Sequence, residues 1–190
     1  MEKIELLDLL FFEDETSTIK NIGLIVDRSI IPNLQVNDDN LYVWELDGED
    51  NMTIFGTYFH ETSNEERLKS FHKIVLGKLK NNPLKNKEKV KDVLEKIHSK
   101  YFKKPYDYSM TSCLSFIYPW IKKLSCHLFD AKIITCSEFI ATVLIELEVL
   151  NAKVNVNEIS PINFYDISTC TLNNKKYITE DIIDQFYNLK

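Results

Sequence analysis

The first half of the chain alternates short apolar runs with acidic or turn-forming residues, which is the pattern of buried β-strands. The runs are rich in β-branched and aromatic side chains, and turn formers such as Asp47-Gly48 end them. A capping-box pattern, Ser63-x-x-Glu66, predicts a short helix to about Phe71. Residues 73–79 fit either a continuation of that helix or a strand, and the strand fits slightly better. The predicted strands cover residues 6–12, 22–26, 41–46, 53–59 and 74–76.

The second half of the chain shows the apolar periodicity of amphipathic helices instead. Pro119 kinks or splits the second of these helices, and the last is inferred from Ile182, Ile183 and Phe186. Strands first and helices later predict an α+β domain, in which about five antiparallel strands form a sheet or open barrel against the helix that begins at Cys136. The predicted helices cover residues 86–101, 109–128, 136–150 and 180–189.

Composition narrows the class of protein. The 190 residues, 44% of them hydrophobic, fit one domain over residues 1–190. Because no apolar run approaches the ~18–20 residues of a membrane span, we expect no transmembrane segment. The start of the chain lacks the basic and apolar regions of a secretion signal. A net charge of −6 argues against a nucleic-acid binder. The four cysteines show no CxxC pair or Cys/His cluster, so we expect free thiols, no metal and no cofactor.

Cys136 occupies the position with the clearest chemical potential. Thr135 and Glu138 complete a capping box, so the helix is predicted to begin at Cys136. There the unpaired backbone N–H groups and the positive end of the helix dipole favour a thiolate and can hold an oxyanion. A buried structural cysteine fits the same local sequence. The remaining cysteines, expected in the core or a loop, have no comparable position: Cys113, Cys126 and Cys170.

A thiolate mechanism needs a general base, which is usually a histidine. His98 is expected to be solvated on its lysine-rich helix. None of the histidines lies in a motif that marks a base, and each is better explained as a surface residue: His60, His72, His98 and His127.

Several short motifs occur in a specific order along residues 6 to 165. They are Asp8-Leu-Leu-Phe-Phe12, Asn21-Ile-Gly-Leu-Ile-Val26, Leu41-Tyr-Val-Trp-Glu45, Pro105-Tyr-Asp-Tyr108, Cys136-Ser-Glu-Phe139 and Ser160-Pro161. This order resembles the circularly permuted papain-like family related to NlpC-type peptidases. That family includes bacterial lipid-associated hydrolases and a poxvirus virion protein.

The resemblance implies roles for individual residues. Cys136 matches the nucleophile and Glu45 the assisting carboxylate, while the position of the catalytic histidine is held by Asn21. An amide takes no proton near neutral pH, and losing general acid–base help costs ~10²–10⁴-fold in rate. The resemblance predicts one cleft shared by these three side chains and bordered by Tyr106 and Asp107. It also predicts that a histidine at position 21 would activate the thiol.

The leading hypothesis is therefore a papain-like thiol-hydrolase homologue that has lost efficient catalysis and acts as a virion-associated or binding protein. The 21 lysines against 2 arginines indicate an AT-rich genome, and with the resemblance they suggest a large DNA virus, with the protein in the virion or infected-cell cytoplasm. The expected partner is a peptide, a lipid-like small substrate, or a viral or host protein. Two alternatives stay open. One is an active cysteine hydrolase or acyltransferase that uses Cys136 with His60 or His127, and the other is a purely structural interaction protein.

Overall fold

The computed structural model describes nine stretches of the chain, and all structural statements below concern them. No helix among these residues is long and apolar enough to cross a membrane. The described stretches are residues 3–13, 19–32, 40–47, 58–59, 62–63, 72–101, 135–156, 159–165 and 182–189.

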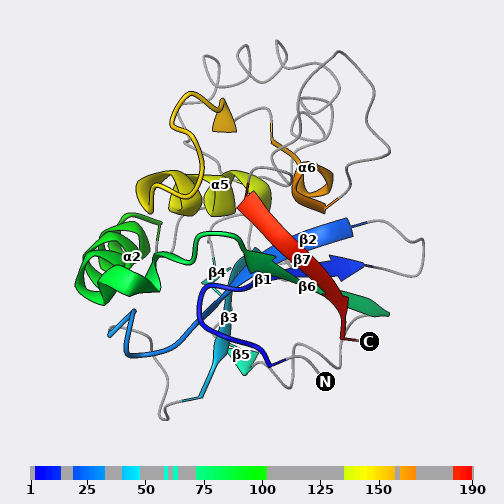
Figure 1. The fold of residues 1–190 in the computed structure, drawn as a ribbon, viewed down its shortest axis with the longest axis horizontal. Coiled ribbons are helices and arrows are strands. Elements are labelled where there is room, and N and C mark those ends of the chain that lie inside the picture. Colours follow the sequence, from blue (N-terminus) through cyan, green and yellow to red (C-terminus); the bar gives the residue numbers. More distant parts are fainter. Residues whose placement is uncertain are drawn as a thin grey trace.

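An antiparallel sheet forms the centre of this mixed α+β structure (Figure 1). Its strands follow the order β4-β3-β2-β1-β6-β7, and β5 also pairs with β3. Four of the predicted strands are confirmed as β1, β2, β3 and β6, and the fifth is described only at its end, as β4. The strand bounds are β1 Leu9–Glu13, β2 Ile19–Val26, β3 Tyr42–Asp47, β4 Tyr58–Phe59, β5 Thr62–Ser63, β6 Lys73–Leu79 and β7 Ile183–Asn188.

The helices pack against one face of the sheet, with α5 and α6 lying over it and α2 at its flank (Figure 1). The predicted helix at 86–101 is confirmed as α2, while α5 ends four residues before the expected residue 150. It ends there because Glu148 takes a left-handed backbone conformation with φ 60°, which turns the chain away from the helix axis. The helix bounds are η1 Pro83–Asn86, α2 Lys87–Tyr101, α5 Cys136–Glu146 and α6 Pro161–Tyr165.

Strand alternation divides the core into two clusters, one on each face of the sheet. The helix-covered face carries Phe11, Leu24 and Trp44 together with the buried side chains of α2 and α5. The opposite face carries Phe12 and Val43. We call these the helix-covered face and the second face.

The predicted helix at 180–189 is wrong, because this segment forms strand β7 along β6. Gln185 pairs with Lys78 and Ile183 with Leu79, so Asp184 is one extra residue in the strand. This β-bulge brings Ile183 and Phe186 to the same face, where both pack with the helix-covered cluster. Two apolar residues three apart therefore mimic a helical stripe in the sequence although they belong to a bulged strand.

Candidate functional site

The start of α5 has the capped geometry that the sequence predicts. Thr135 has extended backbone angles, and its Oγ1 accepts a hydrogen bond from the Glu138 backbone N–H at 3.3 Å. Glu138 Oε2 in turn accepts from the Thr135 N–H at 3.0 Å. The first bond within the helix runs from the Phe139 N–H to the Thr135 carbonyl. Cys136 is consequently the first residue of α5, as predicted.

The capped helix end is buried inside the protein. Cys136 is not disulfide-bonded, and only 3% of the residue is exposed. The neighbouring Ser137 hydroxyl donates to the Ile159 carbonyl at 2.8 Å and also contacts Thr135 Oγ1 at 3.3 Å. The position that the sequence identifies for a reactive thiolate is thus buried, and its neighbours Thr135 and Ser137 are hydrogen-bonded within the chain.

Asn21 and Glu45 form a buried pair on neighbouring strands. The Asn21 side chain donates from Nδ2 to Glu45 Oε2 at 2.8 Å. Its Oδ1 accepts from the Ile22 backbone N–H at 2.9 Å. Both ends of the Asn21 amide are therefore used by partners within the chain. The two positions that the resemblance implies for the base and its assisting carboxylate do lie together.

The pair and the thiol lie on opposite faces of the sheet, not in one cleft as expected. Asn21 is paired with Phe12 across β1 and β2, and Phe12 belongs to the second face. A Cβ at Gly23 would lie 3.4 Å from Glu45 Cβ and 2.5 Å from Val43 Cγ1, which places Glu45 on the same face. Cys136 belongs to the cluster of the helix-covered face. The alternation of β2 and β3 decides this separation, because it directs Asn21 and Glu45 away from α5.

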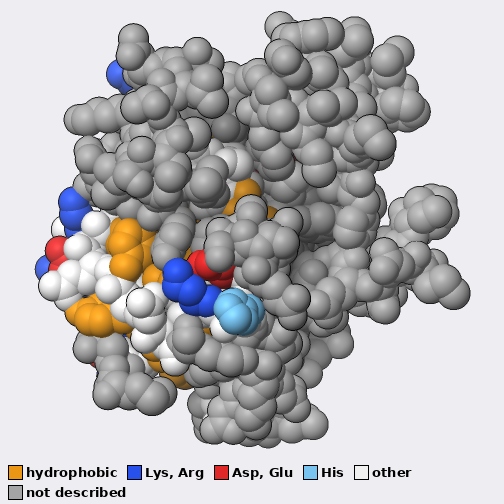
Figure 2. All heavy atoms as spheres, turned by 90° about the vertical axis from the view of Figure 1, so that its right-hand side faces the viewer, with side chains coloured by type: hydrophobic (Ala, Val, Ile, Leu, Met, Phe, Trp, Pro, Cys, Tyr) orange, Lys and Arg blue, Asp and Glu red, His pale blue; other side chains and the backbone are white. Residues whose placement is uncertain are grey.

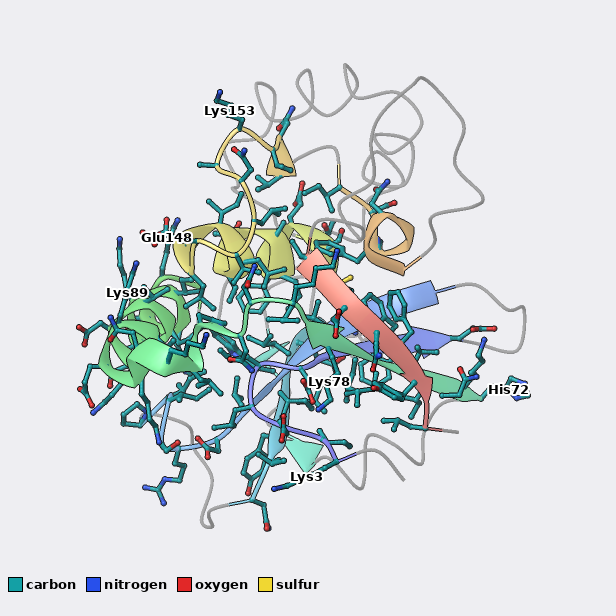
Figure 3. All side chains as sticks on the ribbon, in the orientation of Figure 1. Lys3, His72, Lys78, Lys89, Glu148 and Lys153 are labelled. Carbon is teal, nitrogen blue, oxygen red and sulfur yellow. The ribbon has the colours of Figure 1, made fainter. Side chains whose placement is uncertain are left out.

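The structure corrects the predicted exposure of one histidine. His98, expected to be solvated, is only 5% exposed, and its ring stacks on Trp44. His72 is exposed, as expected. Figure 2 looks onto the end of the molecule where Figure 3 labels His72, and one imidazole lies at that surface. Other residues of the sequence-based site lie outside the described residues: His60, His127, Tyr106, Asp107, Cys113, Cys126 and Cys170.

An ion pair between the buried Asp8 and the partly buried Lys78, at the start of β1, was not predicted. Lys78 Nζ on β6 lies 2.8 Å from Asp8 Oδ2, which also accepts from the Glu5 N–H at 2.7 Å. The same ammonium donates to the Lys3 carbonyl at 2.7 Å, so it ties the N-terminal segment to the sheet (Figure 3). Burial raises the pKa of Asp8, while its hydrogen bond to Lys78 acts in the opposite direction. The sequence signal that could have indicated this ion pair is the acidic residue Asp8 inside the apolar run 6–12.

Within the described stretches, no group of three or more His, Cys, Asp or Glu side chains is arranged to hold a metal ion. Comparisons with protein-family models, with curated proteins and with solved structures give no match to this chain.

Proposed function

We propose that this chain is a non-catalytic binding protein built on a permuted papain-like scaffold. Three features support the proposal: an antiparallel sheet, neighbouring strands that carry Asn21 and Glu45 in contact, and a following helix that begins at Cys136. They occur in the chain order of the resemblance. A permuted papain-like scaffold would have these features, although here Asn21 and Glu45 lie on the opposite face of the sheet from Cys136.

The state of the Asn21 amide carries the proposal. Its nitrogen donates to Glu45 and its oxygen accepts from Ile22, both within the chain. An amide does not take a proton near neutral pH, so this position cannot serve as the general base that a thiol nucleophile requires. It contributes instead a polar link between β2 and β3 inside a buried region. An amide at this position, on the opposite face of the sheet from Cys136, favours binding over catalysis.

The surroundings of Cys136 support the same conclusion. The residue is 3% exposed and lies in the apolar cluster between α5 and the sheet. Reaction with a peptide, ester or lipid would require the substrate to reach this enclosed sulfur. The resemblance and the lysine-rich composition support a virion or an infected cell as the proposed setting. The proposed partner is a viral or host protein.

Site-resolved alkylation tests this proposal. The native protein and the same protein in guanidinium chloride are treated with iodoacetamide between about pH 6 and 9, and mass spectrometry follows Cys136 separately from the other cysteines. We expect native Cys136 to react more slowly than the unfolded thiol at every pH, because burial limits access. A native thiol that reacts faster than the unfolded one near pH 6 would overturn the proposal.

Hydrolysis assays with a peptide amide and a thioester give a second readout. The matched control is Cys136→Ser, which changes one atom at the helix start. We expect no turnover that differs between the two proteins. Turnover that disappears in Cys136→Ser would instead establish the active cysteine hydrolase or acyltransferase.

A further inference from the structure

One face of α2 is buried against the rest of the protein, and a titratable side chain forms part of it. Three members of that face are aliphatic, and the fourth is His98. The His98 ring lies nearly parallel to the Trp44 indole of β3, with an interplanar angle of 13° and ring centroids 6.1 Å apart. The buried face consists of Val90, Leu94, Ile97 and His98.

Trp44 links this stack to α5. The Phe139 ring of α5 meets the indole edge-on, with centroids 4.8 Å apart and an angle of 87°. Trp44 is 1% exposed, so these two ring contacts lie in the core. The imidazole of His98 therefore belongs to a row of three rings that connects α2, β3 and α5.

Each of the elements linked by the three rings carries charged or titratable groups. On α2 itself, Glu95 favours the protonated imidazole, as does the position near the helix C-terminus. On β3, the helix-covered face presents Trp44 and the buried phenol of Tyr42. On α5 and just after it, Glu146 and Glu148 form ion pairs with lysines of α2. Burial is the largest influence, and it lowers the pKa of His98 below its usual value.

The polar contacts between α2 and α5 are weak by comparison. Lys89 lies 2.8 Å from Glu148 (Figure 3), and their side chains are 44% and 76% exposed. Lys96 lies 3.9 Å from Glu146 and is likewise exposed. Exposed pairs of this kind add little to stability. Among the described residues, the attachment of α2 depends mainly on its buried face, to which His98 belongs.

We propose that His98 is a pH sensor: protonation of its ring loosens α2 from Trp44, so α2 is docked at neutral pH and released in mildly acidic surroundings. A neutral imidazole stacks on the indole without a buried charge. Burial disfavours an imidazolium at this place, and movement of α2 away from Trp44 would expose the ring to water. The inference does not depend on the proposed function, because it concerns α2 and not the Cys136 or Asn21 positions.

Nuclear magnetic resonance on the full chain tests the sensor directly. The His98 C2–H shift reports its titration, and amide hydrogen exchange, corrected for the intrinsic pH dependence, reports the protection of α2. We expect His98 to titrate below pH 6.5, the ordinary value, and α2 protection to fall by about tenfold or more with the same midpoint. Protection of the central strand β1 should change less over this range.

Two variants make the test specific. His98→Phe keeps a ring against Trp44 but removes the titration, so α2 protection should no longer change between about pH 7.5 and 4.5. His72→Gln alters an exposed histidine and should leave the transition intact. Should His98→Phe fold poorly, His98→Gln provides the same readout. A transition of α2 that persists without His98, or constant α2 protection in the unmodified chain, would overturn the proposal.

Discussion

Asn21 and Glu45 connect β2 to β3 by a 2.8 Å hydrogen bond on the second face of the sheet, while Cys136 lies in the core of the helix-covered face. Both partners of this bond are buried, with 7% and 0% of the residue exposed. The bond therefore acts where water does not compete for either group. This relationship changes what a substitution at position 21 is expected to do.

Replacing Asn21 by histidine should leave the reactivity of Cys136 unchanged. The resemblance predicts activation, since an imidazole would supply the missing base. The strand alternation directs the side chain of residue 21 away from α5, so the new ring would meet Glu45 instead. The measurement is the site-resolved alkylation rate of Cys136 against pH in Asn21→His and the unmodified protein. A rate that rises several-fold near neutral pH only in the variant would show that the ring reaches the thiol.

Replacing Lys78 by methionine should destabilise the fold more at neutral than at acidic pH. The variant leaves the Asp8 carboxylate buried without its ammonium partner, at a cost of about 3 kcal/mol at neutral pH. Burial already raises the pKa of Asp8 above 3.8, so the folded state holds this proton more tightly than the unfolded state does. The penalty is therefore present above the folded-state pKa and disappears as the pH falls through it.

Urea unfolding of Lys78→Met at about pH 7 and pH 5 measures this difference. The matched control is Lys89→Met, because Lys89 forms an exposed ion pair with Glu148. The control should change the free energy of unfolding by less than about 1 kcal/mol at both pH values. Equal costs for Lys78→Met at the two pH values would contradict a charged, buried Asp8.

Replacing Gly23 by alanine should destabilise the protein through a steric clash. The added Cβ would lie 2.5 Å from Val43 Cγ1, and a β-branched valine in a strand has little freedom to rotate away. We expect a loss of about 1–3 kcal/mol in the free energy of unfolding. A double-mutant cycle with Val43→Ala measures the clash, and the double variant should cost less than the sum of the two single changes. Strict additivity would mean that the strands shift apart instead.

Replacing Glu148 by glycine should stabilise the end of α5. Glu148 has a φ of 60°, a conformation that costs a residue with a side chain about 1 kcal/mol and costs glycine little. The lost ion pair with Lys89 is exposed, so the net gain should be roughly 0.5–1 kcal/mol in thermal or urea unfolding. Glu148→Ala removes the same ion pair but retains the strain. It should therefore give no gain, and an equal gain in both variants would argue against backbone strain.

Local patterns in the sequence determined much of the fold. The apolar composition of β1, β2, β3 and β6 indicates directly that these strands are buried. The start of α5 is encoded by Thr135 and Glu138, which lie within one helical turn. An apolar run and a capping box each depend on neighbouring residues alone, which is why these features could be predicted.

Only the tertiary structure decided the other features, because each depends on a distant partner. Ile183 and Phe186 have a spacing that fits a helix, and pairing with β6 is what makes the segment a bulged strand. His98 is buried because Trp44, from a strand far away in the sequence, lies against it. Alternation shows that Asn21 and Ile22 face opposite ways, but only the packing of α5 decided which of them faces the helix. The sequence contains both sets of side chains, and long-range packing assigns each set to its face.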